Sequence, residues 1–255
     1  DTARSRGLGD VYKRQPLGIA PNFLIDNKNY TIPMAIEESS VVAAACKSAK
    51  FWSKRGGFKT EIIDVIKTGQ VHFKFNGDKN KLYEFFENSK SKILNDCNEI
   101  SENMLARGGG ILNINLIDKT SEISDYYQLS SDFNTVDSMG ANFINSCLEQ
   151  FAKSFETEFL ESKLFDEDEN LEIVMSILSN YVPQCLVKAE VRCKLNELKN
   201  GDVEEPIKFA RKFIDAIEIA KNDISRAVTH NKGIMNGIDA VVIATGNDFR
   251  SVEAC

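Results

Sequence analysis

Hydrophobic residues recur along the middle of the chain with the two periods that distinguish strands from helices. Val71, Phe73 and Phe75 alternate with polar residues, as in a strand with one buried face, whereas Phe151 and Phe155 are four residues apart, as on one face of a helix. These periods predict strands at 61–75, 111–117, 126–136 and 171–178, and helices at 81–105 and 140–159. The order β-α-β-β-α-β is typical of a ferredoxin-like domain, which we place at residues 62–180.

The segments on both sides of this block predict a second, larger domain. Before it, residues 22–34 form two predicted strands around a turn at 26–29, and a predicted helix at 37–55 stops at Gly56 and Gly57. After it, the pattern predicts a strand at 184–195, a turn at Asn200 and Gly201, a helix at 205–221 and, beyond a loop, a last helix from about Lys232. We therefore expect an α+β protein in which the small domain interrupts a large α/β domain formed by residues 16–61 and 181–255.

The two ends of the sequence do not fit a complete protein. Residues 1–15 have neither a helical nor a strand period and resemble translated sequencing-adapter read-through, so we treat them as a non-native leader. At the other end, Cys255 falls inside the last predicted helix. We therefore expect the chain to be a fragment whose large domain is incomplete.

Charge and cysteine content narrow the function classes. The formal net charge of −7 argues against a nucleic-acid partner, because phosphate binding needs clustered Lys and Arg. No apolar run approaches the ~20 residues of a membrane-spanning helix, so we expect no membrane partner. The six cysteines form no Cys-x-x-Cys pair, and we interpret them as reduced residues of a cytoplasmic protein. The two histidines are too few for a histidine-rich metal site, so we expect no metal.

Three segments carry motifs that are specific enough to identify a family. They are PLGIAPNFLI with IPMAIEESSVVAAA in residues 16–45, DSMGANFIN at 137–145, and THNKGIMNGIDAVVIATGNDFRSVEA at 229–254. In order and spacing they resemble class II hydroxymethylglutaryl-coenzyme A (HMG-CoA) reductases, over nearly all of the chain from Pro16. In that family a small dinucleotide-binding domain with a ferredoxin-like core interrupts a large substrate domain, so the resemblance implies that residues 62–180 bind the dinucleotide.

The resemblance also implies an activity and an assembly. It implies an oxidoreductase that uses NADPH or NADH to reduce HMG-CoA to mevalonate and free coenzyme A, or that catalyses the reverse reaction, in mevalonate and isoprenoid metabolism. It implies a homodimer, or an assembly of dimers, with the sites at the subunit interface. The residues themselves decide neither the direction nor the choice between NADPH and NADH.

Three residues match the catalytic residues of the family. Lys232 matches a lysine whose charge would stabilise the negative charge that develops on the thioester oxygen. Glu38 matches a glutamate that would donate a proton to the aldehyde oxygen, and burial or a neighbouring carboxylate would keep it protonated. Asp248 matches an aspartate that would hydrogen-bond the lysine–glutamate pair. Outside their motifs these residues would be interpreted as a helix cap, a surface lysine and a turn residue.

Four further residues are candidates for substrate binding. Ser40 and Arg226 match positions that bind the carboxylate and hydroxyl region of the acyl group, and the arginine fork suits a carboxylate. Asn236 follows Lys232 by one helical turn, so it can face the same site, although it can equally satisfy nearby backbone. Asn180 is a further candidate by its position in the chain.

The motif at 137–142 matches the dinucleotide-binding motif of the family and supplies Asp137, Met139, Gly140 and Asn142 as candidates for cofactor binding. Its small residues would let the ligand approach the backbone, and the helix that begins here can hold an anionic phosphate at its N-terminus. Without the resemblance, the motif would be an ordinary turn before an amphipathic helix.

The chain departs from the family pattern in three places. Ser39 stands where the family usually has proline, and Ser138 stands where many members have alanine, but both changes keep the functional groups. The catalytic histidine of the family lies on a C-terminal segment that would follow Cys255, and neither His72 nor His230 matches it. We therefore expect this fragment alone to be inactive.

Two other functions fit parts of the sequence. The first is a non-catalytic fragment that binds coenzyme A or a dinucleotide without turnover. The second is an RNA-binding ferredoxin-like module, in which Phe73, Phe75, Tyr126 and Tyr127 would stack on bases. The acidic net charge counts against the second.

Overall fold

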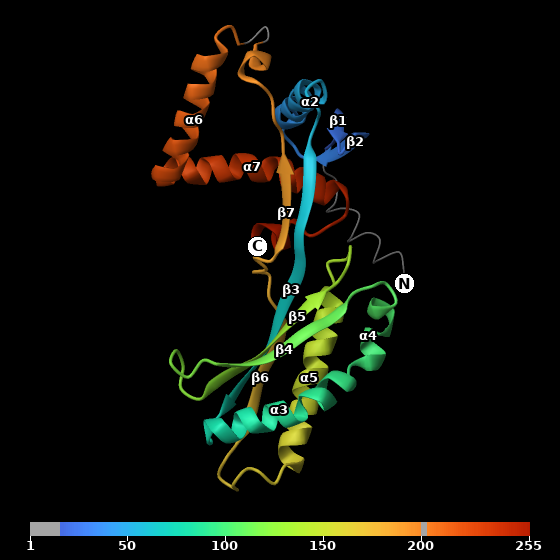
Figure 1. Ribbon diagram of the computed structural model, residues 1–255, viewed down its shortest axis with the longest axis vertical. Helices are drawn as coiled ribbons and strands as arrows, with labels where there is room; N and C mark the ends of the chain where they lie inside the picture. The colour runs from blue at the N-terminus through green and yellow to red at the C-terminus, as the bar shows by residue number, and fades with distance from the viewer. Residues whose placement is uncertain (1–15, 200–202) are drawn as a thin grey trace. The chain divides into compact units, whose positions relative to one another are not determined.

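The computed structural model describes residues 16–199 and 203–255, so the leader at 1–15 and the turn expected at Asn200 and Gly201 lie outside the described residues. The chain separates into two compact units, each described here by itself (Figure 1). Unit 1 comprises the chain up to Glu61 together with Lys188–Glu253, and unit 2 comprises Ile62–Val187 with Ala254 and Cys255. Both units contain helices and strands, which confirms the α+β class. None of the described helices is long and apolar enough to cross a lipid bilayer.

Unit 1 contains a β-hairpin and several helices. Strand β1 (Leu17–Ile25) pairs antiparallel with β2 (Lys28–Ala35), as the sequence predicts. Asp26 and Asn27 in the turn have φ values of 47° and 66°, the left-handed conformations of a tight two-residue hairpin turn. The helices of the unit are α2 (Ser39–Ser53), the short 3-10 helix η1 (Leu195–Leu198), α6 (Pro206–Asn222), α7 (Ile224–Ala244) and α8 (Phe249–Glu253).

A small core joins the hairpin of unit 1 to α2 and α7. Ala20, Met34 and Ala240 are buried at its centre, and Val42 and Cys46 on α2 pack against them. The core therefore fixes the first half of α2 and the second half of α7 against the same hairpin.

The structure corrects the sequence predictions in the C-terminal part of unit 1. Helix α7 begins at Ile224 rather than near Lys232, because the side chain of Asp223 accepts a hydrogen bond from the backbone N–H of Arg226 and caps the helix there. The same helix ends at Ala244, and Gly246 at φ 76° separates it from α8. The strand predicted at 184–195 is shorter: β7 covers Cys185–Glu190, and η1 begins at Leu195.

Unit 2 is an antiparallel sheet with helices packed on it. Strand β3 (Lys59–Phe75) lies between β5 (Tyr126–Asn134) and β6 (Leu171–Leu178), and β4 (Gly110–Asp118) completes the order β4-β5-β3-β6. Strand β7 also pairs with β3. The helices of the unit are α3 (Lys79–Asn95), α4 (Asn98–Leu105) and α5 (Ala141–Glu161), drawn beside the sheet in Figure 1.

Only one face of each central strand points into the core of unit 2. On β3, Val71, Phe73 and Phe75 are buried and their neighbours are only partly buried, which is the alternation read from the sequence. The ring of Phe73 packs edge-on against the ring of Phe155 on α5, with 5.2 Å between the ring centroids. Phe73, Phe75 and Tyr127 are 0%, 2% and 3% exposed, so they cannot stack on RNA bases. The RNA-binding hypothesis therefore loses three of its four aromatic residues.

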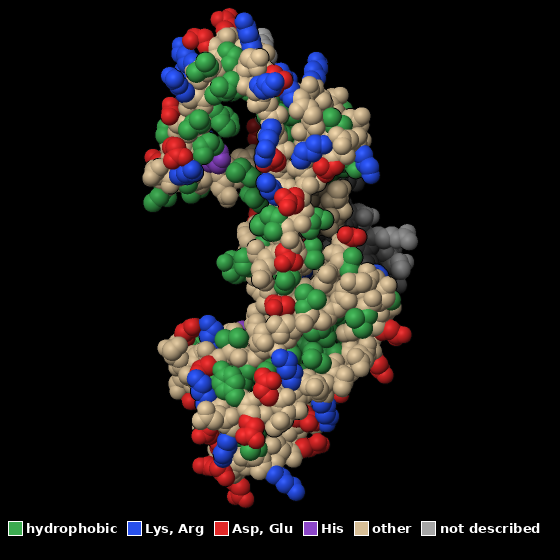
Figure 2. Space-filling model, in the orientation of Figure 1, with side chains coloured by type: hydrophobic (Ala, Val, Ile, Leu, Met, Phe, Trp, Pro, Cys, Tyr) green, Lys and Arg blue, Asp and Glu red, His purple; other side chains and the backbone are tan. Residues whose placement is uncertain are grey.

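The surface charge of unit 2 also gives that hypothesis no support. On the face shown in Figure 2, Lys and Arg side chains are interspersed with Asp and Glu side chains over this unit. A nucleic-acid phosphate backbone requires clustered positive charge.

The helix predicted at 81–105 is broken into α3 and α4. The break lies at Asp96 and Cys97, and both residues are tied to α5. The Ser154 hydroxyl donates a hydrogen bond to Asp96 at 2.6 Å, and the Cys97 thiol donates to the carbonyl of Cys147 at 3.7 Å. These tertiary contacts bend the helix although its hydrophobic period continues across the break.

One carboxylate, Glu169, ties the segment before β6 to the start of α3. It accepts hydrogen bonds from the backbone N–H groups of Asp166 at 2.8 Å and Asp78 at 2.7 Å, and from the Lys81 ammonium at 2.9 Å. These hydrogen bonds, the one from Asp166 first, lower the pKa of Glu169 from 4.5 to about 2. The folded state therefore stabilises the ionised form of Glu169.

We expect Glu169→Gln to be less stable than the wild type at neutral pH, and the difference to shrink in acid. A carboxyl whose pKa is lower in the folded than in the unfolded state stabilises the fold above pH 4.5 and loses this effect as the pH falls from 4.5 toward 2. Urea unfolding midpoints measured from pH 7 downward check this. The neighbouring exposed residue supplies the control, Glu167→Gln, and equal pH profiles for the two variants would contradict the role of Glu169.

Candidate functional site

The motif at 137–142 lies in unit 2, in the turn that connects β5 to α5. Gly140 is the N-terminal cap residue of α5 and has φ 76°, a conformation that favours glycine. A side chain at Gly140 would collide with the side chain of Thr135. The helix begins at Ala141, one residue later than the sequence predicted, so Asp137 and Met139 belong to the turn, where they are exposed.

The turn is closed by hydrogen bonds among its own residues and by one lysine from β3. The Thr135 hydroxyl donates to the carbonyl of Ser138 at 2.7 Å, and the Ser138 hydroxyl donates to the carbonyl of Thr135 at 2.8 Å. The Lys67 ammonium donates to the Thr135 hydroxyl at 2.8 Å and to the carbonyls of Ser138 at 2.6 Å and Met139 at 3.1 Å. Burial lowers the pKa of Lys67 below its ordinary value, and the three acceptors offset the cost of that burial.

Sequence reasoning overlooked Lys67, although the sequence carried a signal for it. In the alternating pattern of β3, Lys67 has the same parity as Gly69, Val71 and Phe73, which face the core. A lysine on the core face of a strand needs hydrogen-bond acceptors nearby, and those that Lys67 finds lie in a turn about seventy residues further along the chain.

The predicted proton donor, Glu38, lies in unit 1 at the N-terminal cap position of α2. Its side chain makes no capping hydrogen bond but accepts one from the Ser40 hydroxyl at 2.6 Å. Both residues are exposed. The structure thus joins two predicted site residues, Glu38 and Ser40, but the described residues do not bury the carboxyl group as proton donation would require.

Lys232, Asn236 and Arg226 all lie on α7 in unit 1. Lys232 therefore sits in the middle of a helix rather than at the start of one, where the sequence pattern placed it. Asn236 is one helical turn further along, so the two side chains share a helix face, as expected. Lys232 and Arg226 are exposed and Asn236 is partly buried.

Asp248 precedes α8 and binds the arginine two residues later. The Arg250 guanidinium donates to both carboxylate oxygens, Nε to Oδ1 at 3.1 Å and Nη2 to Oδ2 at 3.2 Å. These hydrogen bonds hold the pKa of Asp248 below its ordinary value, so the group is an anion at neutral pH. Within the described residues no hydrogen bond or ion pair links Asp248, Glu38 and Lys232 to one another.

The remaining candidates lie in unit 2. Asn180 is exposed just after β6. His72 is half-buried on β3, its Nδ1 is 2.7 Å from the Tyr126 hydroxyl oxygen, and burial lowers its pKa. Among the residues that the structure describes, no group of three or more His, Cys, Asp and Glu side chains is placed to hold a metal ion.

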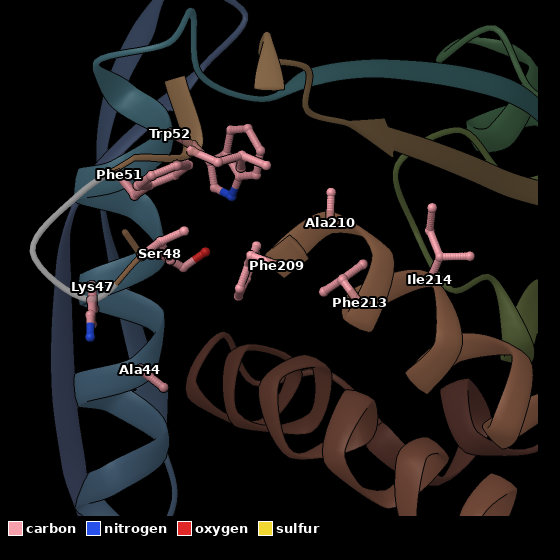
Figure 3. A pocket seen from close by; sticks show the side chains of 11 residues that line it. Ala44, Lys47, Ser48, Phe51, Trp52, Phe209, Ala210, Phe213 and Ile214 are labelled. Atoms are coloured by element: carbon pink, nitrogen blue, oxygen red, sulfur yellow. The ribbon is translucent and has the colours of Figure 1, made fainter. Parts of the chain in front are cut away.

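A cavity of about 540 Å³ opens in unit 1 between α2 and α6. Figure 3 shows Phe51 and Trp52 on α2 facing Phe209 and Phe213 on α6. The described lining residues are mostly apolar and include none of the predicted site residues. The cavity therefore lacks the converging polar groups that a catalytic site requires.

Comparison with known proteins gives one family. The model of the hydroxymethylglutaryl-coenzyme A reductase family matches residues 12–255. The chain is similar to the 3-hydroxy-3-methylglutaryl-coenzyme A reductase of Archaeoglobus fulgidus, with 37% identity over 94% of this chain and 51% of that protein. It is also similar to the probable reductase of Borreliella burgdorferi, with 34% identity over 95% of this chain and 52% of that protein. The chain thus spans about half the length of these relatives.

Solved structures agree with the sequence comparison. The class II 3-hydroxy-3-methylglutaryl-CoA reductase from Streptococcus pneumoniae bound to NADPH in open conformations has a TM-score of 0.78 and 32% identity, over 94% of this chain and 62% of that chain. Another structure of the Streptococcus pneumoniae enzyme has a TM-score of 0.81 and 31% identity, over 99% of this chain and 66% of that chain.

We expect Gly140→Ala to lower the free energy of unfolding by roughly 1–3 kcal/mol. The alanine would have to adopt the left-handed conformation of this position, and its methyl group would collide with the side chain of Thr135. Urea unfolding measures the loss. Gly108→Ala is the matched control, because Gly108 has φ 86° but a methyl group there would meet nothing within 4 Å. A loss in Gly140→Ala no larger than in the control would show that the contact with Thr135 does not matter.

Proposed function

The chain belongs to the hydroxymethylglutaryl-coenzyme A reductase family, and we propose that the protein from which it comes reduces HMG-CoA to mevalonate and free coenzyme A with NADPH or NADH. The observation that carries the proposal is the family match over residues 12–255, which contains all three motifs. The match to a relative bound to NADPH supports the use of a nicotinamide dinucleotide. The assay of cofactor oxidation described below also decides whether NADPH or NADH is preferred.

We assign dinucleotide binding to unit 2 and propose that its core is ferredoxin-like. The strand order β4-β5-β3-β6, with helices between β3 and β4 and between β5 and β6, supports this assignment. The proposed domain at 62–180 corresponds to most of unit 2, which extends to Val187. The flanking segments at 16–61 and 181–255 would form the substrate domain.

The turn at 135–140 fits a dinucleotide. Asp137 and Met139 in the turn and Asn142 in the first turn of α5 are exposed, and Gly140 at the cap position carries no side chain of its own. Amide groups at the start of a helix suit an anionic phosphate. A reduced nicotinamide dinucleotide, when bound, would supply one hydride, so the two reduction steps would consume two molecules of it.

The residues of unit 1 supply charge and protons to the substrate. In the first step the thioester carbonyl becomes a hemithioacetal, and the Lys232 ammonium would stabilise the negative charge that develops on its oxygen. The C–S bond of the hemithioacetal would then break, so that coenzyme A leaves as a thiolate that takes up a proton, and the aldehyde remains. In the second step the aldehyde oxygen would take a proton from Glu38, which accepts a hydrogen bond from the Ser40 hydroxyl. Arg226 would bind the acyl carboxylate, with Ser40 and Asn236 as further contacts to substrate. Asn180, which belongs to unit 2, stays a candidate by its position in the chain.

Asp248 would serve this pair as a fixed anion. The pKa of its carboxyl is lowered by Arg250, so it remains ionised where an ammonium group needs a counter-charge. In the described residues Asp248 is hydrogen-bonded to Arg250 and not to Lys232, although its carboxylate has lone pairs left for a second cation. The proposal therefore includes a rearrangement of the segment around α8.

We also propose a homodimer or an assembly of dimers, in the cytoplasm. The family relationship supports the assembly, and six cysteines present as free thiols suit a reducing compartment.

A second candidate is ligand binding without turnover. It is favoured by the exposure of Glu38 and Lys232 and by the lack of contact among the three catalytic residues in the described chain. Folded, intact protein that binds HMG-CoA or a dinucleotide but does not oxidise the cofactor would select this candidate.

We expect the intact protein to oxidise NADPH or NADH only when HMG-CoA is present, and Lys232→Ala to lower kcat by roughly 10²–10³-fold, since it removes one electrostatic contact to the developing oxyanion. The loss of nicotinamide absorbance measures both. Lys212→Ala, at an exposed position on α6, controls for loss of a surface charge. Unchanged kcat in Lys232→Ala would refute the assigned role.

A further inference from the structure

A lysine that belongs to none of the recognised motifs lies beneath the turn that precedes α5. Lys67 is on the core face of β3, two residues before Gly69, and it is half-buried. A methyl group at Gly69 would come within 2.5 Å of Leu148 Cδ1 and 3.1 Å of Ile144 Cγ2, so α5 approaches β3 closely here. This approach brings the start of α5, with the turn, next to the Lys67 side chain.

All three hydrogen bonds of Lys67 go to that turn. They reach the Thr135 hydroxyl and the carbonyl oxygens of Ser138 and Met139. The Thr135 hydroxyl is buried and donates in turn to the same Ser138 carbonyl. Lys67 therefore fixes two consecutive peptide planes of the turn rather than a single atom.

The orientation of those planes decides where their N–H groups point. In a trans peptide the carbonyl and the following N–H point in opposite directions, and the described chain has no cis peptide bond. Because the carbonyls of Ser138 and Met139 point at Lys67, the N–H groups of Met139 and Gly140 point away from it. These two donors lie beside the first turn of α5, and the Lys67 charge lies behind them.

We propose that Lys67 is a positioning residue for dinucleotide binding, which holds the turn so that the N–H groups of Met139 and Gly140 face a phosphate of the cofactor. This inference rests on the proposed function and adds a residue to its cofactor site. The turn contains backbone conformations that the chain does not favour by itself, φ 54° at Val136 and φ 76° at Gly140. Lys67 supplies contacts that hold it in that conformation when the cofactor is absent.

The test measures NADPH binding by the intact protein together with steady-state kinetics. Lys67→Met keeps an unbranched side chain but removes the charge and the three donors. We expect it to weaken NADPH binding and to raise the KM for NADPH by roughly 10- to 100-fold. The KM for HMG-CoA and the kcat at saturating NADPH should stay within about twofold, which a general loss of folded protein would not produce.

Three further variants separate positioning from folding. Lys67→Arg restores a cation with several donors, and we expect it to recover part of the affinity. Thr135→Val removes one acceptor, and we expect a smaller loss of affinity that is not additive with that of Lys67→Met. Lys74→Met is the matched control on the same strand, since Lys74 donates to the carbonyl of Ser124 instead, and we expect it to bind NADPH like the wild type.

The outcomes are distinct. If folded Lys67→Met binds NADPH as tightly as the wild type does, only the positioning role of Lys67 is overturned. Absence of NADPH and NADH binding by the folded wild type overturns the proposed function. If Lys67→Met does not fold, Thr135→Val decides, because weaker binding at an unchanged unfolding midpoint supports the proposal and unchanged binding rejects it.

Discussion

The close approach of α5 to β3 is the constraint on which the arrangement of unit 2 depends. Gly69 makes it possible, because a side chain there would occupy the space of Ile144 and Leu148. Once α5 lies against the strand, Phe73 and Phe155 pack together, and each buried ring of this kind contributes about 1.5–3 kcal/mol. The position of the turn before α5 follows from this packing. The candidate cofactor site is thus set by a contact between apolar residues, and its polar residues adjust the last details.

In unit 1, by contrast, packing does not enclose the candidate catalytic residues. Glu38 and Lys232 are on elements that share one small core, yet both side chains are exposed, and the Asp248 carboxylate is paired with Arg250. Electrostatic stabilisation of an oxyanion is strong where water is excluded and weak where it is not. The chain therefore carries the three proposed catalytic residues, whereas an environment that excludes water from them is not found in its described part. The proposed activity is accordingly assigned to the whole protein, because the relatives are about twice as long as this chain.

The hydrophobic periods predicted the type of nearly every element, because the alternation in β3 and the spacing of four in α5 come directly from burial of one face. They failed where a single polar contact decides the structure. Asp223 starts α7 eight residues before Lys232, and the ties of Asp96 and Cys97 to α5 break a helix whose period continues. For the site, the motifs named residues but held no information on distance, exposure or partners. Lys67 could have been noticed only by asking which strand position carries a charge on its core face.

The turn before α5 has a strained backbone, and Lys67 binds to it. Val136 at φ 54° is costly for a β-branched residue, and strain of this kind amounts to roughly 1–3 kcal/mol per residue. The local sequence does not favour this conformation, so it persists only because the surroundings impose it. Lys67 on β3 contributes three hydrogen bonds to the turn, and its burial has its own cost, which lowers its pKa. A strand that needed only to pack against α5 would be served by an apolar side chain there. The lysine is therefore best explained by the conformation of the turn that it holds, and so by whatever binds to that turn.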